Sequence, residues 1–281
     1  MSEDHDALER ALALGEEERW DEMAETLVEA LRDDADDPYL LGWLGVAERE
    51  RGNDGAAYEY FKRCVAQDPH DPMLLALAGS GLAAFDDPEA ETALRAAALT
   101  APDIATTRLQ YGAYLARAGL FDEALTQLRA AVELDPEDPV NHGELATALA
   151  LKGDVAGALE PMEQALEIAP DDTWNRALLG LLHAEADDME HAAEHLLAAA
   201  RERVDDPEVQ VAAALAAVAA GWDDAGHEAL ARASLGVEEA ADRELIEEAD
   251  DRIASGADTA REMLRETLGP LMLRERLMEP L

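Results

Sequence analysis

The sequence predicts an all-α fold, a solenoid built from repeated pairs of helices. Three observations support this prediction: apolar positions recur at a spacing of 34 residues, alanine and leucine dominate a composition that is 48% hydrophobic but only 4% aromatic, and Asp-Pro pairs recur where helices would begin. Alanine and leucine are strong helix formers, whereas β-sheets are rich in branched and aromatic residues. The fold class is therefore expected to be all-α.

The 34-residue period is clearest between residues 105 and 138. There Gly112 lies in a first helix that ends at Gly119, Leu128 lies on the apolar face of a second helix, and Pro136 closes the unit. The same places are filled 34 residues further on by Ala146, Gly153, Met162 and Pro170. Such a period is typical of stacked helix pairs. Seven units are expected, at residues 4–37, 38–71, 72–104, 105–138, 139–172, 173–206 and 207–240.

Small residues recur at one place in the first helix of these units. We expect them to let the two helices of a unit pack closely, because a larger side chain would hold the helices apart. A single unit leaves an apolar face bare, so that only a stack of units has a continuous core. The residues are Gly45, Gly79, Gly112, Ala146 and Gly180.

Asp-Pro pairs mark the predicted helix starts. The aspartate oxygen accepts hydrogen bonds from backbone amides that lack a helical partner, and its charge suits the positive end of the helix. Proline lacks the amide hydrogen that would be unpaired there. Pro161 is an exception inside a predicted second helix, where we expect a local kink. The pairs are Asp37-Pro38, Asp71-Pro72, Asp87-Pro88, Asp138-Pro139 and Asp206-Pro207.

This pattern resembles the tetratricopeptide repeat family over about residues 4–240. The resemblance implies a right-handed superhelical solenoid of about seven helix-turn-helix repeats, in which the first helices line a concave face. The chain departs from the family where an aromatic residue usually opens the first helix. The residues at that place are Leu41, Leu75, Arg108, His142, Arg176 and Gln210.

Residues 241–281 are expected to form C-terminal capping helices and an apolar tail. We predict one helix over residues 238–254 and another over 259–268, with Gly269-Pro270 breaking the chain. The tail that follows has three alternatives: it caps the last repeat, folds back into the groove of its own chain, or enters the groove of a second copy. Its apolar residues are Leu271, Met272, Leu273, Leu277 and Met278.

The charge is strongly acidic, with 64 acidic and 22 basic residues and a formal net charge of −42. A surface of this kind repels nucleic acid and anionic membranes. The sequence has no apolar run long enough to span a bilayer, no secretory signal and a single cysteine, Cys64, so we expect a cytoplasmic protein with a buried thiol. The acidity itself has two explanations, solvation in concentrated salt or attraction of a basic partner.

The resemblance implies a scaffold for protein–protein interaction, with partner contacts on the first helices. Carried over by register, the candidate contacts are Tyr39, Arg49, Leu109, Trp174, Leu181 and Leu215. Family members that clamp the terminal carboxylate of a peptide use several basic residues at these places, whereas here only Arg49 is basic. We therefore expect an apolar or amphipathic segment of a partner protein as the ligand. The alternative is a self-assembling structural protein whose tail is the ligand of a second copy.

Signs of catalysis are weak. No phosphate-binding loop with its lysine occurs, no serine lies in a nucleophile-elbow sequence, and Gly79-Ser80-Gly81 falls within a predicted helix. His191 and His195 stand four residues apart, a spacing compatible with metal binding, but no glutamate follows the first histidine as in zinc proteases. We expect these histidines to be solvated, and the chain to be a non-enzyme with neither metal nor cofactor.

Overall fold

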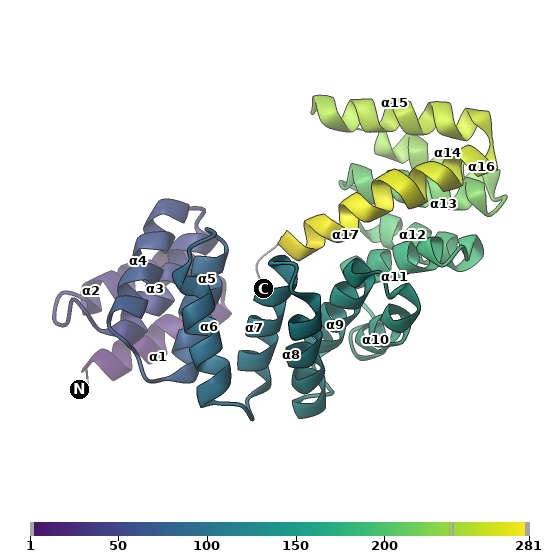
Figure 1. Cartoon of the computed structure of the whole chain (residues 1–281). Helices are drawn as coiled ribbons and strands as arrows, with labels where there is room; N and C mark the ends of the chain where they lie inside the picture. Colours follow the sequence, from purple (N-terminus) through teal and green to yellow (C-terminus); the bar gives the residue numbers. More distant parts are fainter. Residues whose placement is uncertain (1–2, 236, 238, 279–281) are drawn as a thin grey trace. The chain divides into compact units, whose positions relative to one another are not determined.

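The computed structural model describes residues 3–235, 237 and 239–278, with the backbone alone for residues 3–5 and 275–278. Every regular element within these residues is a helix, which confirms the all-α prediction. The chain divides into two compact units (Figure 1). The N-terminal unit extends to Leu134, and the C-terminal unit comprises Asp135–Met278.

The N-terminal unit consists of helices that pack in consecutive pairs, each joined by a short turn (Figure 1). The pairs are α1 (Glu3–Glu16) with α2 (Trp20–Ala30), α3 (Pro38–Glu50) with α4 (Asp54–Ala66), α5 (Pro72–Ala83) with α6 (Glu89–Thr100), and α7 (Ala105–Arg117) with α8 (Phe121–Leu134).

The C-terminal unit continues with α9 (Pro139–Lys152) and α10 (Val155–Ile168), α11 (Thr173–Glu185) and α12 (Met189–Glu202), and α13 (Pro207–Ala219) and α14 (Asp223–Ala233). From α3 onward, each pair lies within one residue range expected for a repeat. The last elements are α15 (Ala240–Ser255), α16 (Ala257–Met263), the π-helix η1 (Leu264–Leu268) and α17 (Gly269–Met278). Helix α10 is continuous through Pro161.

The predicted aspartate caps are present at four of the five Asp-Pro pairs. At Asp37, for example, Oδ1 accepts hydrogen bonds from the amides of Tyr39 and Leu40 at 2.8 and 3.0 Å. The fifth pair differs, because α6 begins at Glu89, one residue later than the proline. Asp87 still accepts the Glu89 amide at 2.8 Å. The four caps that begin a helix at the proline are Asp37, Asp71, Asp138 and Asp206.

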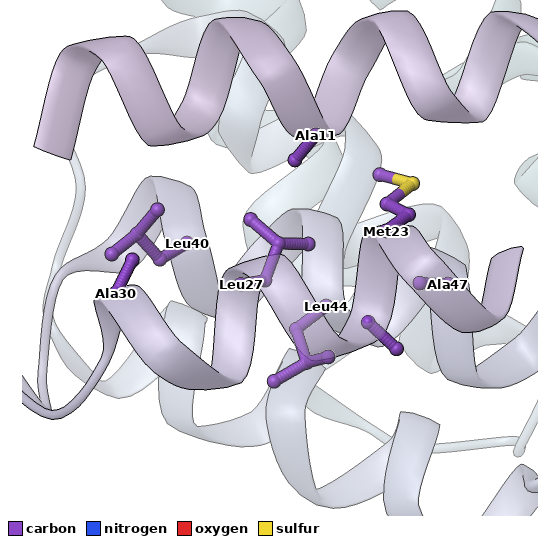
Figure 2. Packing of buried hydrophobic residues seen from close by; sticks show 8 residues of the cluster. Ala11, Met23, Leu27, Ala30, Leu40, Leu44 and Ala47 are labelled. Carbon is purple, nitrogen blue, oxygen red and sulfur yellow. The ribbon is translucent and has the colours of Figure 1, made fainter. Parts of the chain in front are cut away.

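The core is a run of clusters between neighbouring helices. Figure 2 shows the cluster where α1, α2 and α3 meet: Met23 and Leu27 of α2 lie against Leu40 and Leu44 of α3, with Ala11 of α1 above them. These side chains are at most 1% exposed. Burying a side chain of leucine or methionine size stabilises the folded state by about 1.5–3 kcal/mol, so helices from adjacent pairs hold one another in place.

Within a pair, the recurrent glycines allow the close approach that the sequence predicts. A Cβ atom placed on Gly45 would lie 2.6 Å from Cε1 of Phe61, and one on Gly180 would lie 2.7 Å from Cγ of Leu196. Carbon atoms in contact are about 3.5–4.0 Å apart, so no side chain fits there without moving the second helix. Cys64 is buried as expected, and its burial raises the pKa of the thiol to about 12.

The predicted chain break at Gly269-Pro270 is wrong. Gly269 has helical dihedral angles, φ −58° and ψ −49°, and α17 follows η1 directly. The Gly269 amide bonds to the carbonyl of Leu264, five residues back, which is the wider π-helical pattern. In a regular α-helix a proline removes one backbone hydrogen bond, and its ring clashes with the preceding turn. The wider π-turn before Pro270 leaves room for the ring, so the helix continues through this residue.

The C-terminal helices fold back over the first helices of their own unit. Helix α17 packs on α9 and α11, η1 packs on α11 and α13, and α16 packs on α13, while α15 covers α13 and α14 (Figure 1). Met272 and Leu273 are buried, and Leu271 is exposed. The side chains of Leu277 and Met278 lie outside the described part of the chain. Of the three alternatives for the tail after Gly269, the described part, α17, follows the second, because it folds back onto α9 and α11 of its own chain.

Candidate binding groove

The six candidate contact residues lie in three different environments. Tyr39 and Arg49 of α3 are accessible, with Tyr39 40% exposed and Arg49 half-buried. Trp174 of α11 is half-buried. Leu109, Leu181 and Leu215 are 5%, 2% and 0% exposed, so a partner cannot reach them in this structure.

Tyr39 and Arg49 line a cleft of about 350 Å³ in the N-terminal unit, which we call the N-terminal cleft. Its walls come from three successive first helices. Helix α3 contributes Tyr39, Trp43, Val46 and Arg49, α5 contributes Met73, Leu77 and Ser80, and α7 contributes Thr106 and Gln110. Met73 is 42% exposed, like Tyr39, which leaves an apolar surface open at the edge of the cleft.

The polar groups at the rim are held by one carboxylate. The Tyr39 hydroxyl donates to Oδ2 of Asp71 at 2.8 Å, while Oδ1 of Asp71 accepts the amides of Met73 and Leu74 at the start of α5. The hydrogen bond to this carboxylate raises the pKa of Tyr39. Burial by itself raises the pKa of Asp71, but the three donated hydrogen bonds together lower it, so the rim carries a fixed negative charge at neutral pH.

Two polar atoms in the wall of the N-terminal cleft lack partners. The Ser80 hydroxyl and Oε1 of Gln110 are buried and have no hydrogen-bond partner among the described residues. Ser80 as a whole is only 4% exposed. A buried polar group without a partner costs about 1–3 kcal/mol, and a ligand that supplies a donor or acceptor recovers this free energy. The cleft is therefore apolar with two points for directed hydrogen bonds.

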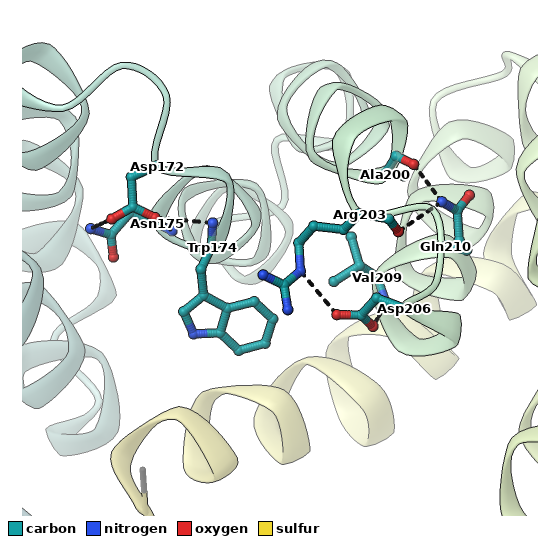
Figure 3. Close-up of polar contacts among 8 residues, drawn as sticks. All are labelled: Asp172, Trp174, Asn175, Ala200, Arg203, Asp206, Val209 and Gln210. Atoms are coloured by element: carbon teal, nitrogen blue, oxygen red, sulfur yellow. Dashed lines mark hydrogen bonds and ion pairs between the residues drawn. The ribbon is translucent and has the colours of Figure 1, made fainter. Parts of the chain in front are cut away.

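The corresponding surface of the C-terminal unit is occupied by its own helices. Figure 3 shows the indole of Trp174 pointing toward the pale yellow C-terminal helix, with the Arg203 guanidinium beside it. The guanidinium carbon lies 4.7 Å from the ring centroid, a cation–π contact, and Nε of Arg203 donates to Asp206 at 3.0 Å. Arg265 of η1 donates to Asp187 at 3.1 Å and to the carbonyl of Glu185.

Sequence reasoning missed Trp43, Leu77 and Gln110 as lining residues. Trp43 follows Tyr39 by four residues and precedes Val46 by three, so the three side chains share one face of α3. Following the helical period from Tyr39, Met73 and Thr106 in steps of four identifies all three missed residues.

The two histidines considered as metal ligands differ in exposure. His191 is exposed as expected, but the expectation fails for His195, which is half-buried. Both rings stack on a third histidine, His183 of α11, with centroid distances of 5.2 Å to His191 and 5.5 Å to His195. The reason is the tight turn between α11 and α12, which brings the last turn of one helix beside the first turns of the next.

Several solved structures have a fold similar to that of this chain. The thermophilic TPR protein TTC0263 of Thermus thermophilus is similar with 28% identity and a TM-score of 0.51, covering 62% of this chain and 95% of that one. A chain of the APC/C hetero-tetramer Cut9-Hcn1 aligns over 85% of this chain and 48% of its own length, with 17% identity and a TM-score of 0.70. A tetratricopeptide repeat protein of Parabacteroides merdae aligns over 89% and 100%, with 14% identity and a TM-score of 0.62.

Among curated proteins, no sequence matches this chain closely enough to count as a relative. In the described part of the chain, no helix combines the length and apolar character needed to cross a membrane. The family model for the tetratricopeptide repeat matches residues 8–72, 86–139 and 112–173, which together are more than half of the chain. With the paired helices and the similar solved structures, this match shows that the chain belongs to the tetratricopeptide repeat family.

Proposed function

We propose that this protein is a scaffold that holds an apolar or amphipathic segment of a partner protein in the N-terminal cleft. The observation that carries the proposal is the cleft itself, with exposed Tyr39 and Met73 at its edge and the unpartnered polar atoms of Ser80 and Gln110 in its wall. Apolar grooves with a few directed polar groups suit peptide segments, which bury their side chains and satisfy their backbone groups at once.

The C-terminal unit supports the choice of an amphipathic, basic ligand. There the first helices α9, α11 and α13 are covered by helices of the same chain that bury Met272 and Leu273 and bring Arg265 against Asp187. The N-terminal cleft likewise has a carboxylate at its rim, Asp71, on a chain of net charge −42. Long-range attraction would speed the approach of a basic segment, and burial of its apolar face would hold it.

The proposal is tested by selecting binders from a peptide library and measuring their affinity for three forms of the chain by fluorescence titration, with Trp43 in the cleft as a reporter. The forms are the unaltered chain, the cleft variant Val46→Glu with Met73→Glu, and Leu99→Glu. Leu99 is 70% exposed on α6 and does not line the cleft, so it is a matched control for added charge on an apolar surface residue.

We expect the cleft variant to lose at least tenfold in affinity for basic amphipathic peptides, because the apolar face of the bound peptide would remove water from the added carboxylates, which is costly. Leu99→Glu should bind like the unaltered chain. Far-ultraviolet circular dichroism establishes that both variants are folded. Equal binding by the cleft variant and the unaltered chain would remove the cleft from the proposal, and the remaining faces would then have to be searched.

Self-assembly through the C-terminal tail is a second proposal. Helix α17 lies on α9 and α11 of its own chain, and exchange with a second copy would repeat the same contacts between molecules. Light scattering over a wide range of concentration tests it with the full chain and a variant that ends at Leu268. A mass that rises with concentration only in the full chain supports exchange, whereas a constant monomeric mass excludes it.

The scaffold proposal also makes the protein a non-enzyme that works in the cytoplasm, without a cofactor or nucleic acid. Its support is the family, whose members are generally scaffolds, together with the acidic charge.

A further inference from the structure

Three potential metal ligands meet at the turn between α11 and α12. His183 lies in the last turn of α11, Asp188 precedes the first residue of α12, and His191 lies in the first turn of α12. One donor atom from each side chain lies within 4.8 Å of the others. We propose that His183, Asp188 and His191 bind a divalent transition metal ion, for which zinc fits best.

The distances agree with a shared ion. Ligand atoms bound to one tetrahedral zinc at about 2.0–2.2 Å are about 3.3 Å from one another. Oδ2 of Asp188 lies 2.7 Å from Nδ1 of His191 and 3.8 Å from Nδ1 of His183, one value on each side of that spacing. All three ligand atoms lie within 4.8 Å of one another, so binding would need rotation of the Asp188 side chain and of the histidine rings to reach the tetrahedral spacing.

The two oxygens of Asp188 have different partners, and the second one already lies between the histidine rings. Oδ1 accepts the backbone amide of His191 and caps α12. Oδ2 forms a hydrogen bond of 2.7 Å with Nδ1 of His191 and lies 3.8 Å from Nδ1 of His183, and a bound ion would take the place of the proton between Oδ2 and His191. Metal binding at Oδ2 therefore keeps the helix cap, and the cap in turn holds the carboxylate beside both histidines, as an outer hydrogen bond commonly does in metal sites.

The donor set determines the class of ion. Two imidazoles with one carboxylate suit zinc, cobalt, nickel and copper, whereas magnesium and calcium prefer sites made of oxygen atoms alone. The acidic chain also concentrates cations near its surface. Three protein ligands leave one tetrahedral position for water or a fourth group. Because His183 and His191 belong to different helices, the bound ion would clip α11 to α12.

This inference is independent of the N-terminal cleft, and it is tested on tag-free protein by calorimetric titration with zinc and by cobalt absorption spectroscopy. We expect one zinc ion per chain, a rise in the melting temperature that grows with zinc concentration, and a cobalt spectrum typical of low coordination number. His183→Ala and His191→Ala should each weaken binding more than tenfold. His227→Ala, which alters an exposed histidine on α14, should leave affinity unchanged.

Asp188→Asn separates loss of the ligand from loss of the helix cap. Asparagine caps a helix as well as aspartate does but lacks the carboxylate charge. We expect it to melt normally without metal and to bind zinc at least tenfold more weakly. Zinc binding that survives all three substitutions, or that is lost equally in His227→Ala, would overturn the proposal, as would no stoichiometric binding by the unaltered chain.

Discussion

Three side chains at equivalent places in successive repeats each donate a hydrogen bond to the backbone carbonyl six residues earlier. Arg108 donates to the carbonyl of Pro102 at 3.2 Å, and Arg176 donates to that of Pro170. Nε2 of His142 lies 2.9 Å from the carbonyl of Pro136 and must carry the proton, since a carbonyl only accepts. These are the places where the family usually has an aromatic residue, so hydrogen bonds here replace an apolar contact.

In the next repeat the closing proline is absent, and the corresponding side chain forms different hydrogen bonds. Val204 stands where the closing proline would be, and Gln210 occupies the place of the donor. The Gln210 amide donates to the carbonyls of Ala200 and Arg203 instead (Figure 3). Gln210 is completely buried, so its amide needs these partners.

Also at the residue scale, Gly112→Ala should destabilise the N-terminal unit. The new Cβ would lie 2.8 Å from Cγ of Leu128, and overpacking of this kind costs about 1–3 kcal/mol. Gly55→Ala is the matched control within α4, because its Cβ meets nothing within 4 Å among the described residues. That change should be neutral or stabilise by up to about 1 kcal/mol. Urea unfolding measures both, and an equal loss in the two variants would contradict the close approach of α7 and α8.

At the scale of elements, Asp87 ties α4 to the start of α6. Its carboxylate accepts the Tyr58 hydroxyl at 2.9 Å and the Lys62 ammonium at 2.8 Å from α4, and the Glu89 amide at 2.8 Å from α6. Burial by itself raises the pKa of Asp87, but Lys62, the Glu89 amide and the Tyr58 hydroxyl outweigh it, so the pKa lies below its ordinary value of 3.8.

This direction determines how acid affects the tie. A lowered pKa in the folded state means that the ionised carboxylate stabilises the fold above the pKa of the unfolded chain, about 3.9, and that this stability is lost as the pH falls through the lower folded value. Asp87→Asn should therefore destabilise the protein at pH 7, and the difference from the unaltered chain should shrink below about pH 4. Urea midpoints across this range measure it, with exposed Asp103→Asn as control. A difference that is constant with pH would contradict the ionic tie.

At the scale of the whole molecule, the charge of −42 comes from acidic residues along the entire chain. Self-repulsion of these charges opposes the compact state, and salt screens it over a Debye length of about 10 Å at 0.1 M and about 3 Å at 1 M. We therefore expect the melting temperature to rise by several degrees as potassium chloride is raised from low to molar concentration. Scanning calorimetry measures this, with sucrose as an uncharged control.

The result also separates the two explanations of the acidity. A large rise with salt supports adaptation to concentrated salt. A melting temperature that does not change with salt leaves attraction of a basic partner as the explanation, and affinity for basic peptides should then fall steeply as salt is added.

The sequence by itself determined the class of the fold and the internal plan of each repeat. Gly45, Gly112 and Gly180 predict close helix pairs because the absence of a side chain is a local property, and the cap at Asp37 follows from its own backbone and the proline beside it. The recurrent glycines and the aspartate caps both act within one repeat, so the repeat pattern is enough to identify them.

Only the tertiary structure decided which surfaces remain open. Leu181 and Leu215 have the same register as accessible groove residues, yet they are buried where α16, η1 and α17 fold back. His183 lies eight residues from His191, and only the turn between α11 and α12 brings the two rings together. The exposure of a side chain and the geometry of a metal site depend on contacts between different elements. A repeat pattern describes the average neighbour of each position, so it contains no information about the particular helix that covers a given residue.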